Sequence, residues 1–161
     1  IVHGPAAGIT GGRLLQDPIC TEDIYPTTMA LAGLPLPGPK PGLDLGPYMR
    51  GEVSELDRDA IYLELVEEHR PMALFFGRPW RGVRTRRFKY TTLNGHPWHL
   101  FDLQEDPYEM NNLVGSENHR SLVRRLHLTL ADMIRENGDS YVLSDLDNPL
   151  PPEPAAGLSE P

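Results

Sequence analysis

Cationic side chains gather in one stretch of this chain, where they could bind an oxyanion. The formal net charge is -8, yet residues 78–89 contain Arg78, Arg81, Arg84, Arg86, Arg87 and Lys89. Guanidinium groups are planar forks of N–H donors that match carboxylate, phosphate and other tetrahedral oxyanions. We expect Arg84 and Lys89 to form structural ion pairs. Arg81, which follows Trp80 at the junction of a loop and a strand, is the better candidate for ligand contact.

A histidine and a second tryptophan widen the set of candidate contacts. His69 lies in a loop after a predicted strand at residues 61–65, where it either contacts a ligand or is simply exposed to solvent. Trp98 adjoins a hairpin turn, where its indole could stack on a sugar ring or cover the sheet edge, and we favour covering. The candidate binding residues are therefore His69, Trp80 and Arg81.

The remaining ionisable residues predict neither a metal site nor a catalytic pair. The six histidines lack metal-ligand spacing. Glu105, Asp106 and Glu109 surround an Asp-Pro dipeptide, and we expect them to cap a turn through bonds to nearby backbone. The single cysteine, Cys20, excludes an internal disulfide.

These candidates lie on elements that the residue pattern predicts. Val83 and Thr85, and then Phe88, Tyr90 and Thr92, alternate with the period of a β-strand. Asn94-Gly95 is a strong signal for a type I′ hairpin turn, because that turn needs positive φ at both central positions. A further strand should cover residues 98–103.

A helix should follow the strands. From Ser116, which can cap its first amides, apolar residues recur at three- and four-residue spacing, namely Leu122, Val123, Leu126, Leu130, Met133 and Ile134. Asn137-Gly138 supplies a left-handed stop. The predicted fold class is α+β, a small antiparallel β-sheet packed by a C-terminal amphipathic helix.

Two motifs resemble the C-terminal region of the type I, arylsulfatase-like sulfatases of the alkaline-phosphatase-like superfamily. They are VRTRRFKY at residues 83–90 and LFDLQEDPYEMNNL at residues 100–113, with Phe88 and Phe101 as conservative aromatic exchanges. Upstream, EDIYPTTMALAGL at residues 22–34 is similar to a helix of the same family. PGLDL at residues 41–45 is similar to the segment that follows that helix, with Asp44 in place of a small residue.

The resemblance implies a catalytic apparatus that this chain does not carry. Sulfatases hydrolyse sulfate esters with a formylglycine made in a C/S-x-P/A-x-R motif and with a divalent cation, usually calcium. The residues after Cys20 do not match that motif, and those after Ser121 match only its final arginine. Asp147-Asn148 precedes a proline in a tail and receives no metal role. We expect no catalytic residue and no metal ligand here, and an inactive fragment.

The same resemblance divides the chain. Residues 1–46 are interpreted as a remnant of the catalytic α/β domain, 47–54 as a linker, 55–142 as the sheet-and-helix subdomain and 143–161 as a Pro-rich disordered tail. The chain begins without an initiator Met or leader, as if in mid-domain, and we expect the helix at 22–34 to be loose without its packing partners. No transmembrane run is visible, and the negative charge argues against nucleic acid as a partner.

The function that the resemblance implies is that of a sulfatase part lining the substrate cleft. Its partners would be a sulfated small molecule or glycan and the missing catalytic domain, in a parent protein that is periplasmic or secreted. Two alternatives stay open: a phosphonate or phosphate monoester hydrolase of the same superfamily, and a non-catalytic interaction module or pseudo-enzyme subunit.

Overall fold

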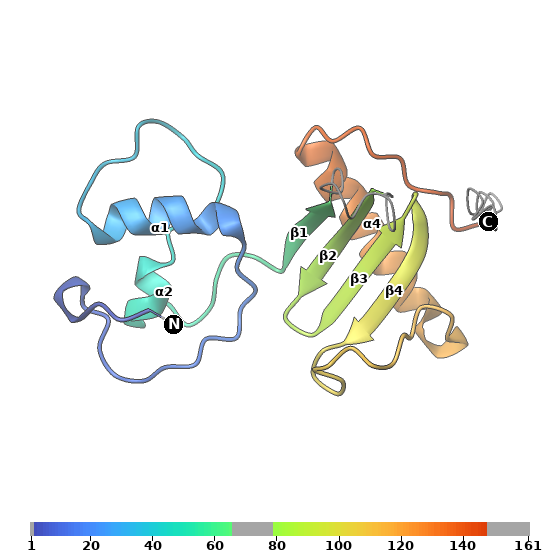
Figure 1. The fold of residues 1–161 in the computed structure, drawn as a ribbon, viewed down its shortest axis with the longest axis horizontal. Coiled ribbons are helices and arrows are strands. Elements are labelled where there is room, and N and C mark those ends of the chain that lie inside the picture. Colours follow the sequence, from blue (N-terminus) through green and yellow to red (C-terminus); the bar gives the residue numbers. More distant parts are fainter. Residues whose placement is uncertain (1, 66–78, 148–161) are drawn as a thin grey trace, which may run out of the picture. The chain divides into compact units, whose positions relative to one another are not determined.

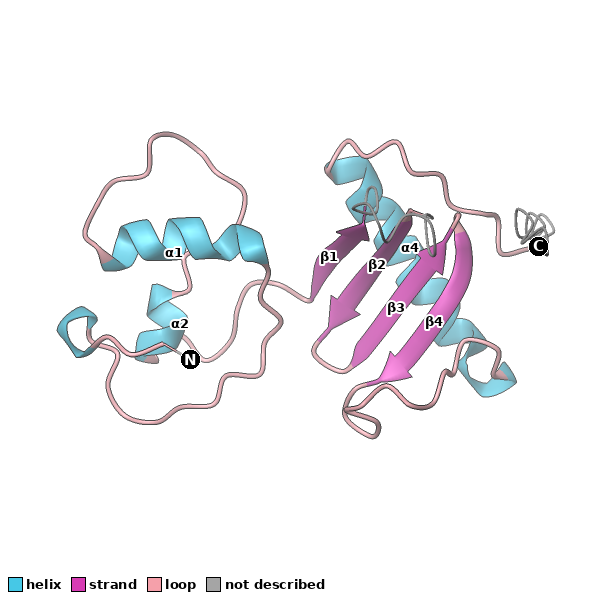
Figure 2. Ribbon diagram, viewed as in Figure 1, coloured by secondary structure: helices cyan, strands magenta, loops and turns pink. Residues whose placement is uncertain are grey.

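The computed structural model describes residues 2–65 and 79–147, and the chain divides into two compact units after Ile61 (Figure 1). We call these the N-terminal unit and the sheet unit. Figure 2 shows the difference between them, since the first consists of short helices and loops and the second is built on a β-sheet.

Short helices form the N-terminal unit. Two 3-10 turns, η1 (Pro5–Ala7) and η2 (Thr21–Asp23), precede α1 (Ile24–Leu31) and α2 (Gly46–Arg50). The helix predicted at residues 22–34 is present as η2 followed directly by α1. Pro26 is tolerated because it lies in the first turn of α1, where a backbone N–H has no partner within the helix.

Asp23 ties this unit together from the start of α1. Its side chain is fully buried and accepts hydrogen bonds from the backbone N–H groups of Cys20 and Leu43. Two nitrogen atoms of Arg58 also donate to it, each at 2.7 Å. Burial alone would raise the pKa of Asp23, but the bonds from Arg58 and the backbone outweigh it and hold the pKa below its ordinary range.

Four strands make the sheet in the order β1-β2-β3-β4, where β1 is Ala60–Leu65, β2 Trp80–Thr85, β3 Phe88–Leu93 and β4 His96–Asp102. β3 pairs antiparallel with both β2 and β4, and the β1 arrow runs opposite to β2 (Figure 1). Asn94 and Gly95 have φ values of 49° and 82° between β3 and β4, which confirms the predicted turn.

A single long helix, α4 (Arg120–Glu136), covers one face of the sheet and lies behind it in Figure 1. Its buried apolar side chains lie at the predicted spacing, namely Val123, Leu126, Leu130 and Ile134. Val83, Tyr90 and Leu100 of the sheet have no exposed surface. The predicted α+β architecture of sheet and closing helix is confirmed.

The sequence prediction was wrong about the cap at the start of this helix and is confirmed at its end. Ser116 does not cap it through its side chain, because its Oγ bonds Nδ1 of His119 at 3.0 Å and a 3-10 turn, η3 (Glu117–His119), opens the helix instead. At the other end Gly138 has a φ of 64°, so the predicted left-handed stop is confirmed.

Two observations concern residues next to the predicted segment boundaries. α2 begins at Gly46 and covers the first four of the residues 47–54 that the sequence analysis interprets as a linker. Beyond residue 142, the backbone N–H and the Oγ of Ser144 both donate to the carbonyl oxygen of Gly95, each at 3.0 Å. Ser144, which lies beyond residue 142, is thus hydrogen-bonded to the turn between β3 and β4. No helix among the described residues is long and apolar enough to cross a membrane.

Candidate functional site

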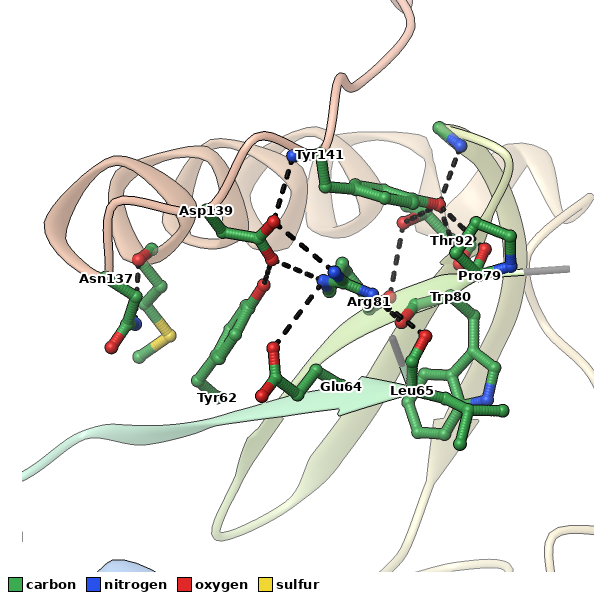
Figure 3. Close-up of polar contacts among 12 residues, drawn as sticks. Tyr62, Glu64, Leu65, Pro79, Trp80, Arg81, Thr92, Asn137, Asp139 and Tyr141 are labelled. Carbon is green, nitrogen blue, oxygen red and sulfur yellow. Dashed lines mark hydrogen bonds and ion pairs between the residues drawn. The ribbon is translucent and has the colours of Figure 1, made fainter. Parts of the chain in front are cut away.

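The described structure separates the residues predicted to contact a ligand. His69 lies outside the described residues. Trp80 and Arg81 are successive residues of β2, so their side chains point to opposite faces of the sheet. Arg81 points to the face that α4 covers and the Trp80 indole points away from it (Figure 3). A ligand on the face opposite α4 would therefore meet Trp80 but not Arg81.

Arg81 is at the centre of a buried polar cluster (Figure 3) and is only 4% exposed. Its Nε and Nη2 atoms donate to the two carboxylate oxygens of Asp139, at 2.5 and 3.3 Å. Its Nη1 atom donates to the carbonyl oxygens of Leu65 and Trp80, at 2.9 and 3.0 Å. The ring of Tyr141 lies 4.8 Å from the central guanidinium carbon, within cation–π range.

The residues of this cluster do not change their protonation state near neutral pH. Hydrogen bonds from Arg81 and then from the Tyr62 hydroxyl, 2.6 Å away, hold the pKa of Asp139 well below its ordinary range. Burial, and next the bond to Asp139, raise the pKa of Tyr62. Glu64 adds a second carboxylate 3.8 Å from Arg81 Nε. Asp139 is thus ionised and Tyr62 protonated at neutral pH, as suits a structural cluster rather than proton transfer.

The cluster joins three separate parts of the sheet unit. Arg81 bonds the backbone at the end of β1, through Leu65, and at the start of β2, through Trp80. Tyr141 adds a hydrogen bond from the Gly95 N–H to its hydroxyl, 2.7 Å long. Asp139 and Tyr141 were missed by the sequence prediction. They follow α4 in a segment with no periodic pattern, and only their position just after the helix stop could have suggested a role.

The ion pair predicted for Lys89 is confirmed. Its Nζ lies 2.5 Å from Oε2 of Glu109, a residue with a positive φ of 56° in the turn after β4. The turn also follows the prediction for Asp106, whose carboxylate accepts the backbone N–H of Asn111 at 2.7 Å. Arg84 is exposed, and its predicted ion pair stays a prediction.

Neither a nucleophile nor a metal centre is assembled in the described part of the chain. No group of three or more His, Cys, Asp or Glu side chains that could hold a metal ion occurs among residues 2–65 and 79–147. The Cys20 thiol has a pKa raised by burial and by the adjacent Asp23, which makes it a poor nucleophile. Asp147 is paired with Arg124.

Two characterised relatives resemble most of this chain. An ulvan-active sulfatase from Formosa agariphila is 30% identical over 146 residues, which are 90% of this chain and 28% of the relative. A Delta 4,5-hexuronate-2-O-sulfatase from Bacteroides thetaiotaomicron is 33% identical over 130 residues, 80% of this chain and 26% of the relative. The chain therefore spans between a quarter and a third of the length of these relatives.

Two solved structures are also similar to this chain. A protein in complex with its substrate D-glucosamine-2-N,6-O-disulfate is 27% identical, with a TM-score of 0.61 over 73% of this chain and 24% of the other. A phosphonate monoester hydrolase of Agrobacterium radiobacter, with 24% identity and a TM-score of 0.56 over 82% of this chain and 28% of the other, shares the fold alone.

The family model that matches covers nearly all of the two described units. It is the model for N-sulphoglucosamine sulphohydrolase, C-terminal, and it matches residues 2–136. That range includes α1, the whole four-stranded sheet and α4 up to its last residue. The chain thus belongs to the N-sulphoglucosamine sulphohydrolase C-terminal family, and it resembles the C-terminal region of sulfatases.

Proposed function

We propose that the complete protein hydrolyses sulfate esters and that this chain forms one wall of its substrate cleft. The family match over residues 2–136 carries the proposal, together with two relatives whose printed names are those of sulfatases. The residues after Cys20 and Ser121 do not match the C/S-x-P/A-x-R motif. The wall would therefore shape the site and select the substrate without taking part in the bond cleavage.

The reactive groups belong, in this proposal, to the part of the protein upstream of residue 1. A formylglycine would supply the nucleophile and a divalent cation, calcium in most sulfatases, would polarise the sulfate oxygens. The described residues do not fit either group, because they contain no motif for the first and no ligand cluster for the second. We expect the isolated chain to be inactive.

Three residues of this chain are proposed to act on the substrate. Trp80 would contact it from the face of the sheet opposite α4, and His69 from the segment that precedes β2. Arg81 has four of its five N–H donors committed to Asp139, Leu65 and Trp80, so a direct substrate contact would use the remaining Nη2 donor. Its larger effect would be to fix the start of β2 and with it Trp80.

The substrate class is proposed to be a sulfated glycan. The relatives' names point to ulvan and to a 2-O-sulfated hexuronate, and a structural neighbour binds a disulfated glucosamine. Arg84 and the other basic residues before Tyr90 would favour such polyanions over neutral sugars.

Sequencing the complete gene and assaying the complete protein test this proposal. We expect an upstream C/S-x-P/A-x-R motif, release of inorganic sulfate from sulfated disaccharides, and loss of that release when the motif's Cys or Ser is replaced by Ala. Trp80→Ala should raise KM more than it lowers kcat. A complete protein that lacks the motif, or that cleaves phosphonate monoesters and releases no sulfate, would refute the proposal.

A further inference from the structure

A β-bulge in the edge strand β4 changes the direction in which Trp98 points. Thr91 pairs with His99, but the next residue of β3, Thr92, pairs with Pro97, so Trp98 is the extra residue. Bulges of this kind re-aim a side chain that regular alternation would send to the other face. The Trp98 ring therefore lies beside that of its sequence neighbour His99, with the ring centroids 3.9 Å apart and the planes at 33°.

Three aromatic rings form a continuous ladder along β4. The His99 ring is stacked on Phe101 with centroids 5.3 Å apart, and Trp98 follows at the open end. His99 is held by a 3.2 Å bond between its Nδ1 and Oγ1 of Thr91, and Asn112 Nδ2 donates to the Trp98 carbonyl at 2.9 Å. The ladder is thus pre-organised, because both backbone and side chain are fixed before any ligand arrives.

Trp98 exposes the outer part of this ladder. The residue is 40% exposed, although its ring is packed on one side against His99. Phe101 and His99 lie on the face of the sheet opposite α4, since Leu100, which lies between them in β4, and its cross-strand partner Tyr90 are buried beneath that helix. An exposed aromatic ring on a fixed strand is typical of a ligand platform rather than of a core.

The strands that form this face belong to a basic stretch of sequence in a protein that is otherwise acidic. Residues 80–101 contain five basic residues and not one Asp or Glu, whereas the whole chain has a formal charge of -8. Arg81 points to the α4 face, and Arg87 and Lys89 are paired with Asp102 and Glu109, so the positive charge available on this face is that of Arg84. Arg84, Lys89 and Phe101 form one row across three strands, so an exposed guanidinium lies on the same face as the ladder. Lys89 lies 5.8 Å from the Phe101 ring.

We propose that the exposed Trp98 ring at the open end of this ladder, together with Arg84, forms a binding surface for a sulfated glycan chain. The exposed indole face would carry a sugar ring, because the negative π-face attracts its polarised C–H bonds, and the Arg84 fork would hold a sulfate of a neighbouring sugar unit. Burial and the nearby Lys89 lower the pKa of His99, so the ladder stays uncharged at neutral pH and recognition by charge falls to Arg84. The surface rests on the proposed function only for the class of its ligand.

NMR titration of the 161-residue, 18.0 kDa chain with a heparin-derived tetrasaccharide tests this surface. We expect saturable shifts at the Trp98 indole N–H and at the amides of Arg84 and His99. The same tetrasaccharide without its sulfates should bind about tenfold more weakly. Shifts that are absent, that spread over all basic residues, or that are equal for both sugars would overturn the proposal.

Matched variants separate stacking from general attraction. Trp98→Ala should weaken binding about tenfold and Trp98→Phe much less, whereas Tyr108→Ala, which removes an aromatic ring that is 85% exposed outside the ladder, should have no effect. Arg84→Gln should weaken binding and Arg135→Gln on α4 should not. Equal affinity of the wild type and Trp98→Ala, in a variant whose amide spectrum is otherwise preserved, would overturn the proposal. Binding of inorganic polyphosphate to the same residues, with the same affinity as the tetrasaccharide, would also overturn the proposal.

This binding experiment is independent of sulfate hydrolysis. If the complete protein releases sulfate but the chain shows no binding at Trp98, only the Trp98 surface is refuted. If binding at Trp98 is found and the complete protein has no sulfatase activity, only the proposed function is refuted.

Discussion

The carboxylate of Asp139 lies 2.5 Å from Nε of Arg81, although the two residues are 58 positions apart in the chain. This pair joins β2 to the segment that leaves α4, and through Arg81 it also reaches the backbone of Leu65 and Trp80. The side chains are 5% and 13% exposed, so water screens their attraction little. This ion pair thus holds the segment after α4 against β2. The sequence alone does not reveal it, because the two residues are far apart in the chain.

Asp139→Ala should destabilise the sheet unit by about 3 kcal/mol, because removing one partner leaves a buried guanidinium without its counter-charge. Urea denaturation followed by tryptophan fluorescence measures this directly, since both tryptophans, Trp80 and Trp98, lie in the sheet unit.

Asp132→Ala is the matched control for that change. Asp132 also pairs with an arginine, Arg135, but both side chains are more than half exposed, and such pairs contribute little. Equal losses of stability in the two variants would contradict the assignment of Asp139 as the closing residue.

His127 should make the sheet unit less stable in mild acid. Its Nε2 faces the Ser144 carbonyl and must donate, so Nδ1 accepts from the Tyr90 hydroxyl at 2.8 Å and the ring is neutral. Burial lowers the pKa of His127, and the bond to Ser144 offsets this only in part. A depressed pKa means that its contribution is complete above the unfolded value of about 6.5 and is lost as pH falls through the folded value.

The pH effect is measured as a difference between two proteins. Unfolding free energies of the wild type and of His127→Gln, taken at pH values from about 7.5 down to about 5, should converge on acidification. A constant difference across that range would show that His127 does not titrate with unfolding.

Leu130 and Leu128 provide a test of which face of α4 is the core. Leu130 has no exposed surface and Leu128 is 60% exposed. Leu130→Ala should cost about 3 kcal/mol because it leaves a cavity, whereas Leu128→Ala should change stability little. The two unfolding curves decide this, and similar midpoints for both variants would contradict the packing of α4 on the sheet.

Two glycines with positive φ should respond differently to alanine. Gly138→Ala meets no atom within 4 Å at a φ of 64°, so only the left-handed backbone is penalised, by about 1 kcal/mol. A Cβ at Gly95, with a φ of 82°, would lie 2.4 Å from the Val142 carbonyl oxygen. Gly95→Ala should therefore cost clearly more, and a smaller loss than in Gly138→Ala would contradict the close approach of the two backbones.

α1 should exchange its amide hydrogens faster than α4. Ile24 and Tyr25 of α1 are 62% and 45% exposed, whereas α4 buries a full apolar face. Hydrogen exchange followed by NMR should give weak protection at Ile24, Met29 and Leu31 and strong protection at Leu126 and Leu130. Strong protection throughout α1 would refute this.

Local patterns were sufficient to predict the elements of the sheet unit. Alternation around Val83 and Tyr90, the Asn94-Gly95 turn and the spacing of Leu126 and Leu130 each depend on residues close in sequence, and the structure confirms all three. The family also followed from the sequence, because ordered motifs at residues 83–90 and 100–113 are specific to it. The prediction that Ser116 caps the helix was wrong, because the nearby His119 binds the same hydroxyl.

Contacts between distant residues were decided only by the tertiary structure. Asp139 lies next to Arg81 because α4 packs across the sheet and ends close to β2. The periodic pattern of the sequence does not predict where the chain lies after the helix. The direction of Trp98 depends on one extra residue opposite Thr91 and Thr92, which is a property of strand pairing rather than of either strand. Sequence thus determined which elements form, because those depend on neighbours. Folding determined which charges and rings meet, because that depends on how the elements pack.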